Sequence, residues 1–450
     1  MKKNDYFIGE CVDMSHDGKG IVKYEGFTYF VNGMITGEVG KIKCIKMLKN
    51  YGVGRLIEIN EPSIYRQAPR CHIYQGCGGC HLMHLNQTGQ QLFKTKRVKD
   101  CMERIGHSYV EVQDCLMQDD PWYYRNKVQV PVGYNQKGEL VTGFYKQRTN
   151  DIIANDHCLI QNNDSNKIVK RVKELMIQYQ IEPYDKVKHT GNIKHILTKK
   201  GFYSQEVMLV FISYRQTIPH IQEIVDQLTK EFQQIKTIIQ NINPRHDNVI
   251  LGDQEIYLYG PGYIYDTLLG NKYKISLKSF YQINPIQVEV LYSKAIAAAT
   301  LSKEDVVLDA YCGIGTITLS LSQHVKKVYG VEIVEAAIKD AKNNALINHI
   351  DNVEFICDDA GKYMIDLVKQ DIHLDVVFVD PPRKGCSKEF LDYLIKANPK
   401  QIIYISCDVA TQARDIAYLQ DFGFQVTYCQ PVDMFPHTSH IENIVRIEKA

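Results

Sequence analysis

From about residue 273 onward, short apolar runs alternate regularly with helical segments, and this alternation constrains the fold more than any other feature of the chain. The predicted strands cover residues 306–308, 328–331, 353–356, 376–379, 402–405 and 426–428. Strands that alternate with helices in this way form a doubly wound parallel sheet. A last apolar run, 440–449, follows the sixth strand without room for a helix, so we expect it to enter the sheet antiparallel.

The 450 residues are too many for one core, and the pattern divides them into three domains. Residues 1–60 contain short strands with glycine turns, which predict a small β-barrel of the oligonucleotide-binding (OB) kind. The pattern of residues 61–270 predicts a central α+β domain, and that of residues 271–450 predicts the domain with the parallel sheet. The expected fold class is therefore α/β with an OB-like barrel in front.

Basic residues concentrate at the amino-terminal end, although the net charge of the whole chain is only +1. Residues 1–110 carry 16 Lys and Arg against 10 Asp and Glu. Basic residues interleaved with aromatic ones favour binding of single-stranded RNA. The residues concerned are Lys41, Lys43, Lys46, Lys49 and Arg55, with Tyr24, Phe27, Tyr29 and Phe30. Aromatic residues of a barrel are also common in its core, so both interpretations stay open.

Two absences in the sequence bear on where the protein works. No apolar run reaches the roughly 18 residues of a membrane helix, and the first residues lack the apolar stretch of a signal peptide. We therefore expect a soluble, cytoplasmic protein with no membrane partner. Thirteen unevenly spaced cysteines in such a protein favour metal binding or catalysis over a disulfide framework.

The segment 308–321 (LDAYCGIGTITLSL) has the strand, glycine turn and helix start of a nucleotide-binding site. Gly313 and Gly315 match the first two glycines of the dinucleotide fingerprint, and Thr318 stands where the third would be. An acidic residue that ends the strand, Asp309, is typical of enzymes that bind S-adenosyl-L-methionine. The sequence therefore predicts a methyl-donor pocket here.

Three more carboxylates follow the next strands of the predicted sheet. Glu332 is placed to bind the ribose hydroxyls, Asp359 could meet the adenine, and Asp380 ends the fourth strand. Any one of them could be a helix cap instead. Four carboxylates at consecutive strand ends favour the donor pocket.

Cys407 follows the strand 402–405, at the sheet edge where open α/β sheets bind their ligands. A thiolate there can add to carbon 6 of a pyrimidine ring, which makes carbon 5 nucleophilic toward a methyl group. A base must then remove the proton from carbon 5. We expect Glu442 to be that base, with His437 and His440 as alternatives.

The motif DPPR (380–383) argues against methylation of an amino group. Enzymes with that activity carry a similar motif that ends in an aromatic residue, whereas Arg383 stands here. We expect Arg383, Lys384 or the following helix start to lower the pKa of the Cys407 thiol.

Cys71, Cys77 and Cys80 have the spacing C-x5-C-x2-C, and Cys158 is a plausible fourth ligand. Four thiolates bind either zinc or an iron-sulfur cluster. Only one C-x2-C unit is present, and Gly78 and Gly79 let backbone amides turn toward sulfur, which favours the cluster. Zinc and unliganded thiols remain alternatives.

Taken together, these motifs resemble the RNA 5-methyluridine methyltransferases of the bacterial 23S ribosomal RNA type, over essentially the whole chain. The most specific matches are the cysteine motif, SFYQINPIQVEVLY (279–292), DAYCGIGTITL, DPPRKG, ISCDVATQARD and MFPHTSHIENIV (434–445). The resemblance implies a Rossmann-like class I methyltransferase sheet, an amino-terminal TRAM barrel and a helix near 85–108 packed on the methyltransferase domain.

The same resemblance implies roles for individual residues. Cys407 would be the nucleophile and Glu442 the base of an RNA (uracil-5-)-methyltransferase. The implied contacts of S-adenosyl-L-methionine are Gln282, Tyr311, Glu332, Asp359 and Asp380, and the implied 4Fe-4S ligands are Cys71, Cys77, Cys80 and Cys158. A TRAM domain is typical of the ribosomal RNA branch and absent from the transfer RNA branch, so the expected partner is 23S ribosomal RNA, with no obligatory protein partner.

Four alternatives differ in substrate or class. A tRNA uridine-5 methyltransferase would share the chemistry. An RNA 5-methylcytidine transferase also uses a cysteine adduct, but it carries a second cysteine after the proline of the fourth-strand motif, and Cys386 lies too far along. A non-catalytic iron-sulfur RNA-binding protein is disfavoured by the intact Cys407 and Glu442. A redox sensor would lose RNA binding on mild oxidation.

Overall fold

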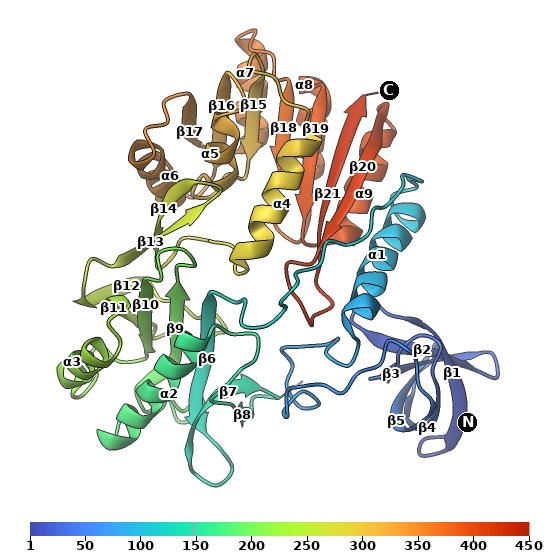
Figure 1. Ribbon diagram of the computed structural model, residues 1–450, viewed down its shortest axis with the longest axis vertical. Helices are drawn as coiled ribbons and strands as arrows, with labels where there is room; N and C mark the ends of the chain where they lie inside the picture. Colours follow the sequence, from blue (N-terminus) through green and yellow to red (C-terminus); the bar gives the residue numbers. More distant parts are fainter. Residues whose placement is uncertain (147–148, 450) are drawn as a thin grey trace.

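The protein begins with a closed five-stranded barrel (blue in Figure 1). The structure is a computed structural model and describes residues 1–146 and 149–449. The barrel strands are β1 (Tyr6–Met14), β2 (Lys19–Tyr24), β3 (Phe27–Asn32), β4 (Val39–Met47) and β5 (Gly52–Glu61). Every second residue along β1 and β2 is buried, as expected for strands with one face on a core. The predicted small barrel is therefore confirmed.

The aromatic residues of the barrel divide between its core and its surface. Tyr29 is only 1% exposed, and the rings that precede it along β2 and β3 pack against the same core. The core interpretation thus holds for most of the predicted aromatic residues. Tyr6 is instead 55% exposed, and the ammonium groups of Lys41 and Lys43 lie 5.6 and 5.4 Å from its ring centre.

A seven-stranded sheet from the middle of the chain (green in Figure 1) has the order β12-β11-β10-β9-β6-β7-β8. Its strands are β6 (Lys127–Tyr134), β7 (Leu140–Tyr145), β8 (Ile152–Ala154), β9 (Ile193–Lys200), β10 (Val207–Ser213), β11 (Ile235–Ile242) and β12 (Gln254–Tyr259). Helices α2 (Asn163–Gln178) and α3 (Ile221–Glu231) pack on one face. Residues of the other face, such as Leu197 and Met208, continue into the core of the carboxyl-terminal part.

The hairpin of β13 (Tyr263–Leu268) and β14 (Asn271–Ser276) leads into a second seven-stranded sheet, in the order β17-β16-β15-β18-β19-β21-β20 (orange to red in Figure 1). Its strands are β15 (Val306–Ala310), β16 (Lys327–Glu332), β17 (Val353–Cys357), β18 (Val376–Val379), β19 (Gln401–Ser406), β20 (Phe424–Val432) and β21 (Glu442–Lys449). Strands β15 to β19 are parallel, and β21 pairs antiparallel with β19 and β20. The predicted parallel sheet and its antiparallel last strand are confirmed.

Six helices flank this sheet. They are α4 (Pro285–Ala298), α5 (Thr316–Ser322), α6 (Glu335–Ile347), α7 (Ala360–Lys369), α8 (Lys388–Ala397) and α9 (Val409–Gln420). Across residues 1–146 and 149–449, the structure contains no helix with the length and apolar character needed to cross a bilayer.

Helix α1 (Gln87–Arg104) follows the barrel in sequence but packs against α9 and β20 (Figure 1). The side chain of Asn86 accepts a hydrogen bond from the Gly89 amide at 2.9 Å and so caps the helix start. Val98 and Met102 of α1 are fully buried in the core around α8 and α9. An element from the first quarter of the chain therefore supports the carboxyl-terminal sheet.

Candidate functional site

The ends of three neighbouring strands bring Asp380, Cys407 and Glu442 to one edge of the carboxyl-terminal sheet. Asp380 directly follows β18, Cys407 directly follows β19, and Glu442 is the first residue of β21. In the antiparallel ladder of β19 and β21, Ser406 lies opposite Asn443. The next pair in that register is Cys407 and Glu442, so the register places these two residues side by side.

The environment of Cys407 raises the pKa of its thiol. Burial is the main cause, and the carboxylates of Glu442 and Asp380 add to it, so the thiol pKa reaches about 11. The charge of the Arg383 guanidinium lowers the thiol pKa, as we expected, but burial and the two carboxylates outweigh it. The expected net lowering of the thiol pKa is therefore wrong for the protein without RNA.

Glu442 is only 4% exposed, and burial together with Asp380 raises its pKa well above the usual range, against the effect of Arg383. Burial also raises the pKa of Asp380 to about 7. The guanidinium of the exposed Arg383 thus acts on both Cys407 and Glu442, and the Cys407 thiol is protonated at neutral pH. Such an arrangement can pass a proton between sulfur and carboxylate without taking it from bulk water.

The two alternative bases, His437 and His440, lie in an environment that lowers their pKa values. Burial lowers the pKa of His437 and that of His440 to about 4, so both rings are neutral at pH 7. The His437 ring stacks on Trp122 with 4.1 Å between ring centres. The backbone carbonyl of His437 accepts hydrogen bonds from the His81 and Leu82 amides, both at 2.9 Å. His437 therefore joins three segments of the chain at the loop that precedes Glu442.

The glycine turn after β15 leaves open space at the strand end. Tyr311 has a φ of 73° and Gly315 one of 85°, both in the left-handed region. A Cβ on Gly315 would lie 2.8 Å from the Phe355 ring, so only glycine fits there, whereas one on Gly313 would meet no atom within 4 Å. The turn can therefore admit a ligand beside Gly313.

Asp309 is fully buried beneath this turn. The Thr318 hydroxyl donates a 2.5 Å hydrogen bond to one carboxylate oxygen, while the other oxygen has no hydrogen-bond partner within residues 1–146 and 149–449. Burial raises the Asp309 pKa to about 7. Thr318, which looked only like a missing glycine in the sequence, thus holds a carboxylate that has an unused acceptor.

Glu332 and Asp359 both accept hydrogen bonds from backbone amides, which agrees with the alternative that such carboxylates act as caps. A Glu332 oxygen accepts from the Val334 amide at 3.0 Å, and an Asp359 oxygen accepts from the Lys362 amide at 3.0 Å at the start of α7. A carboxylate has acceptor capacity beyond one such bond, so capping does not prevent ligand binding. Ile333, which sequence reasoning missed, is 73% exposed directly after Glu332 and offers an apolar surface at this strand end.

Gln282 reaches this region from the connection between the two large sheets. It is largely buried, and its backbone carbonyl accepts a 2.9 Å hydrogen bond from the Asn126 side chain. Asn284, two residues later, caps α4 through the Gln287 amide at 3.2 Å. The exposed Phe280 ring, also missed from the sequence, lies two residues before Gln282.

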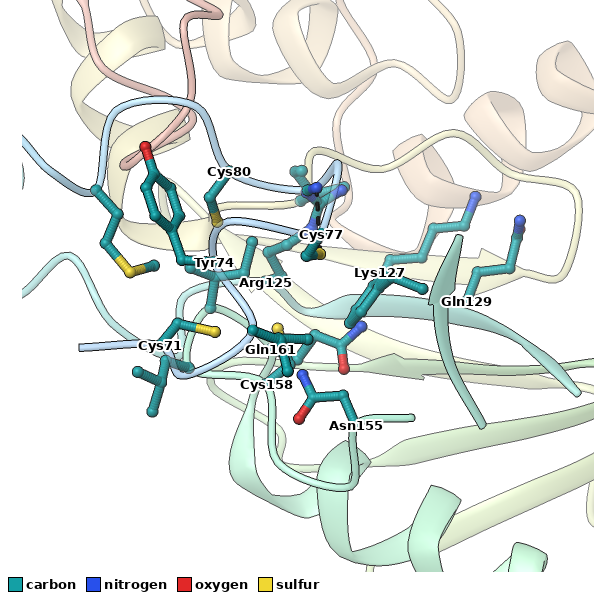
Figure 2. Close-up of a pocket in the computed structure, with 17 residues that line it drawn as sticks. Cys71, Tyr74, Cys77, Cys80, Arg125, Lys127, Gln129, Asn155, Cys158 and Gln161 are labelled. Carbon is teal, nitrogen blue, oxygen red and sulfur yellow. Dashed lines mark hydrogen bonds between the residues drawn. The ribbon is translucent and has the colours of Figure 1, made fainter. Parts of the chain in front are cut away.

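The four predicted ligand cysteines line one cavity of about 420 Å³ between the loop after the barrel and the central sheet. Figure 2 shows the sulfur atoms of Cys71, Cys77, Cys80 and Cys158 around a common space. Burial raises the pKa values of three of these thiols, that of Cys158 to about 11. In the part of the chain that the structure describes, no three His, Cys, Asp or Glu side chains are close enough to hold a metal ion.

The chain is similar over most of its length to proteins named RNA methyltransferases. The tRNA (uracil-5-)-methyltransferase family model matches residues 87–450. A protein of Clostridium acetobutylicum, named an uncharacterized RNA methyltransferase, is 46% identical over 451 residues, which cover 100% of this chain and 98% of that protein. A Bacillus cereus protein with the same description is 43% identical over 453 residues, with 100% and 98% coverage.

One solved structure covers almost the same length. The crystal structure of Pyrococcus abyssi tRNA (uracil-54, C5)-methyltransferase in complex with S-adenosyl-L-homocysteine has a TM-score of 0.78 and 25% sequence identity. It covers 98% of this chain and 99% of its own. The likeness therefore includes most of the barrel as well as both large sheets.

Proposed function

The chain belongs to the tRNA (uracil-5-)-methyltransferase family, and from this membership we propose how it modifies RNA. It is an RNA methyltransferase with a class I methyltransferase fold, takes its methyl group from S-adenosyl-L-methionine and acts on carbon 5 of uracil. Our proposal is that the methyl group reaches the uridine through a covalent adduct on Cys407. The side-by-side position of Cys407 and Glu442 carries this proposal.

The reaction would proceed in three balanced steps. The Cys407 thiol gives its proton to the Asp380 carboxylate, so Glu442 stays free to act as the base, and the thiolate adds to carbon 6 of uracil, which leaves an enolate with negative charge at carbon 5 and oxygen 4. Carbon 5 then takes the methyl group from sulfonium sulfur, which departs as neutral S-adenosyl-L-homocysteine. Glu442 removes the proton from carbon 5, and the C6–S bond breaks to restore the ring double bond and the thiolate. Arg383, which opposes the high thiol pKa, would stabilise the thiolate before attack.

The donor would lie across the strand ends of β15, β16 and β17. We propose that Gln282, Tyr311, Glu332, Asp359 and Asp380 contact it, as the resemblance implies. Three observations support that placement: the open side of the turn at Gly313, the unused oxygen of Asp309 and the exposed apolar Ile333 beside Glu332. An apolar surface next to a carboxylate suits an adenine ring joined to a ribose.

We also propose that Cys71, Cys77, Cys80 and Cys158 hold a 4Fe-4S cluster, which would tie the loop after the barrel to the central sheet. Four thiols around one cavity fit this group, since such clusters are held by four cysteine thiolates. The amino-terminal barrel would correspond to a TRAM domain.

For the RNA we propose a uridine of 23S ribosomal RNA, and a tRNA uridine is the second candidate. We expected the barrel to separate the two classes, but that expectation does not hold. The Pyrococcus abyssi protein, whose name states a tRNA substrate, covers 98% of this chain, so most of the barrel is included. The ribosomal assignment therefore depends on the motif resemblance alone.

Mass spectrometry of RNA from cells with and without the gene would test the proposal. Ribosomal and transfer RNA are digested separately, and 5-methyluridine is mapped in each. Loss of the methyl group from one site in 23S RNA, restored by the wild-type gene but not by Cys407→Ala, is the expected result. If the missing methyl group lies in tRNA, the second candidate is correct. If neither RNA class changes, the proposed substrates are both wrong.

A further inference from the structure

A second polar cavity, of about 250 Å³, lies in the central domain at the amino end of β9. Its lining includes Tyr145, Tyr184, Lys186, His195, Arg245 and His246. The carboxyl end of the same strand touches the start of the methyltransferase part, where the Lys199 ammonium donates to the Ser276 and Ser279 carbonyls at 2.9 and 2.8 Å. From Lys194 to Lys199 the strand runs roughly 17 Å. We call this space the β9 cavity.

Tyr184 lines the β9 cavity and is held by the groups around it. The Tyr184 and Tyr214 rings lie 4.7 Å apart, and the Lys194 ammonium stands 4.6 Å from the centre of the Tyr184 ring. The Tyr184 hydroxyl hydrogen-bonds to His189 Nδ1 at 2.8 Å and to His246 Nδ1 at 3.1 Å. Since both the ring and the hydroxyl are held, Tyr184 is positioned before any ligand arrives.

Three basic side chains line the β9 cavity, Lys186, Lys194 and Arg245, against one carboxylate, Asp247, which acts on Lys194 as well as on Arg245. Among the residues that the structure describes, neither Lys186 nor Lys194 forms an ion pair, and Asp247 is paired with Arg245 at 2.7 Å. Burial and the two lysines lower the pKa of His195 to about 4, and its Nδ1 has no hydrogen-bond partner in the same described part. A bound anion would relieve the repulsion between the lysines, and His195 could then hydrogen-bond to it or to an attached ring.

We propose that the β9 cavity binds one unstacked nucleotide of the RNA substrate, outside the reaction site, with the base against the tyrosine rings and the phosphate beside Lys186. The inference rests on RNA being the substrate of this chain. Proteins that bind single-stranded RNA combine aromatic rings for the base with basic side chains for the phosphate, and the β9 cavity has both. A contact outside the reaction site would help to select the RNA that is methylated.

Charge reversal at two lysines of one hairpin tests the proposal. Lys186 lines the β9 cavity, whereas the exposed Lys188, two residues later, does not, so Lys188→Glu is the matched control. The full-length protein is titrated into a fluorescein-labelled 30-nucleotide single-stranded RNA of mixed sequence, with anisotropy measured at several salt concentrations. Lys186→Glu should weaken binding about fivefold or more and reduce the salt slope by about 0.7, as loss of one phosphate contact on a single strand requires. Equal effects of the two reversals, or no effect of Lys186→Glu, would overturn the proposal.

Photocrosslinking with the same RNA, substituted with 4-thiouridine, locates the contact directly. The expected adducts are on peptides that contain Tyr184 or Tyr214, and Tyr184→Ala should remove them. Adducts confined to the barrel and the carboxyl-terminal sheet would contradict the β9 cavity as an RNA site. Loss of the adducts in excess uridine monophosphate would also contradict it, because the cavity would then bind free nucleotides. Binding of S-adenosyl-L-homocysteine, measured by calorimetry, should be unchanged in each variant and controls for folding.

These experiments separate the β9 cavity from the proposed reaction. Methylation by the control variant Lys188→Glu should match that of the wild type, whereas Lys186→Glu should raise the KM for RNA. If the wild-type protein methylates no RNA, the proposed function fails, yet the comparison of Lys186→Glu with Lys188→Glu still decides whether the β9 cavity binds RNA.

Discussion

At the scale of single residues, the candidate reaction site has an unusual balance of charge. Asp380, Cys407 and Glu442 can all carry negative charge, and Arg383 is the cation that acts on Cys407 and on Glu442. Burial raises the pKa of each of the three, so ionisation costs more for each of them than it would in water. This favours a nucleophile that is activated only when the RNA base and the donor are both in place.

The two residues assigned to catalysis should fail at different steps. Cys407→Ala cannot form the adduct and should give neither methylated RNA nor a covalent complex. Glu442→Gln keeps the nucleophile but cannot remove the carbon 5 proton, so methylated RNA should remain attached to Cys407 as a denaturant-resistant gel band that requires S-adenosyl-L-methionine. General bases accelerate such a step about 10²- to 10⁴-fold, so slow release is compatible with this role. Wild-type turnover by Glu442→Gln would exclude Glu442 as the base.

The charges around Cys407 also predict the pH dependence of its alkylation without RNA. The thiolate is the reactive form, so the rate of reaction with iodoacetamide should rise with pH toward the thiol pKa of about 11. Glu442→Gln removes a negative neighbour and should shift the rise to lower pH, whereas Arg383→Gln should shift it to higher pH. Mass spectrometry of the peptide that carries Cys407 distinguishes it from the other cysteines. Shifts in the same direction for both variants would contradict this electrostatic account.

At the scale of secondary-structure elements, helix α1 holds the loop that leads to Glu442. The Lys94 ammonium and the Asp433 carboxylate form a fully buried ion pair, and Lys94 also donates to the Phe435 carbonyl at 3.3 Å. The Gln90 side chain accepts from the His437 amide at 3.0 Å. The approach to β21 is therefore fixed by a helix more than 300 residues earlier in the chain.

Removal of one partner of this buried ion pair should be costly. Lys94→Ala leaves the Asp433 carboxylate buried and unpaired, and we expect a loss of about 3–5 kcal/mol in the free energy of unfolding. The double change Lys94→Met with Asp433→Leu removes both charges and should recover most of that stability. Lys99→Ala, on the exposed side of the same helix, should change it by no more than about 0.5 kcal/mol. Urea unfolding followed by circular dichroism measures all three, and equal losses for Lys94→Ala and Lys99→Ala would contradict the role of the pair.

At the scale of the whole molecule, the cysteine cavity and the candidate reaction site are joined through one loop. The His81 and Leu82 amides, directly after Cys80, bind the His437 carbonyl, and the Ser439 amide donates to His81 Nδ1 at 3.3 Å. The segment that carries three of the four cysteines therefore packs on the segment that precedes Glu442. A group bound by the cysteines would hold both segments in place.

Iron content and local stability test the proposed cluster. Protein purified without oxygen should be brown and contain about four irons per chain, as a cluster on four thiolates implies. Cys80→Ser should lose the colour and increase amide hydrogen exchange in residues 70–85 and 434–441, because the two segments are hydrogen-bonded together. Cys357→Ser, at an exposed cysteine far from the cavity in sequence, is the matched control. This variant should keep the brown colour and the wild-type rate of amide hydrogen exchange. Colourless wild-type protein with one zinc per chain would contradict the proposal.

Local sequence patterns determined the kind of fold and the strand ends at which the site residues lie. The alternation after residue 273 predicted the parallel sheet and its antiparallel last strand, because strand period and connection length are local properties. The same patterns placed Asp380 and Cys407 directly after strands and predicted the barrel. The position of Glu442 opposite Cys407 could not be predicted from local patterns, because it depends on the register between β19 and β21.

Only the tertiary structure decided which groups are buried and which charges act on one another. The sequence suggested that Arg383 would lower the thiol pKa of Cys407, but enclosure of that thiol beside two carboxylates reverses the net effect. Three further features could not be predicted from the sequence: the burial of Tyr29 inside the barrel, the exposure of Ile333 and the ion pair of Lys94 with Asp433. Burial and electrostatic interaction arise between segments far apart in the chain, so no local pattern encodes them.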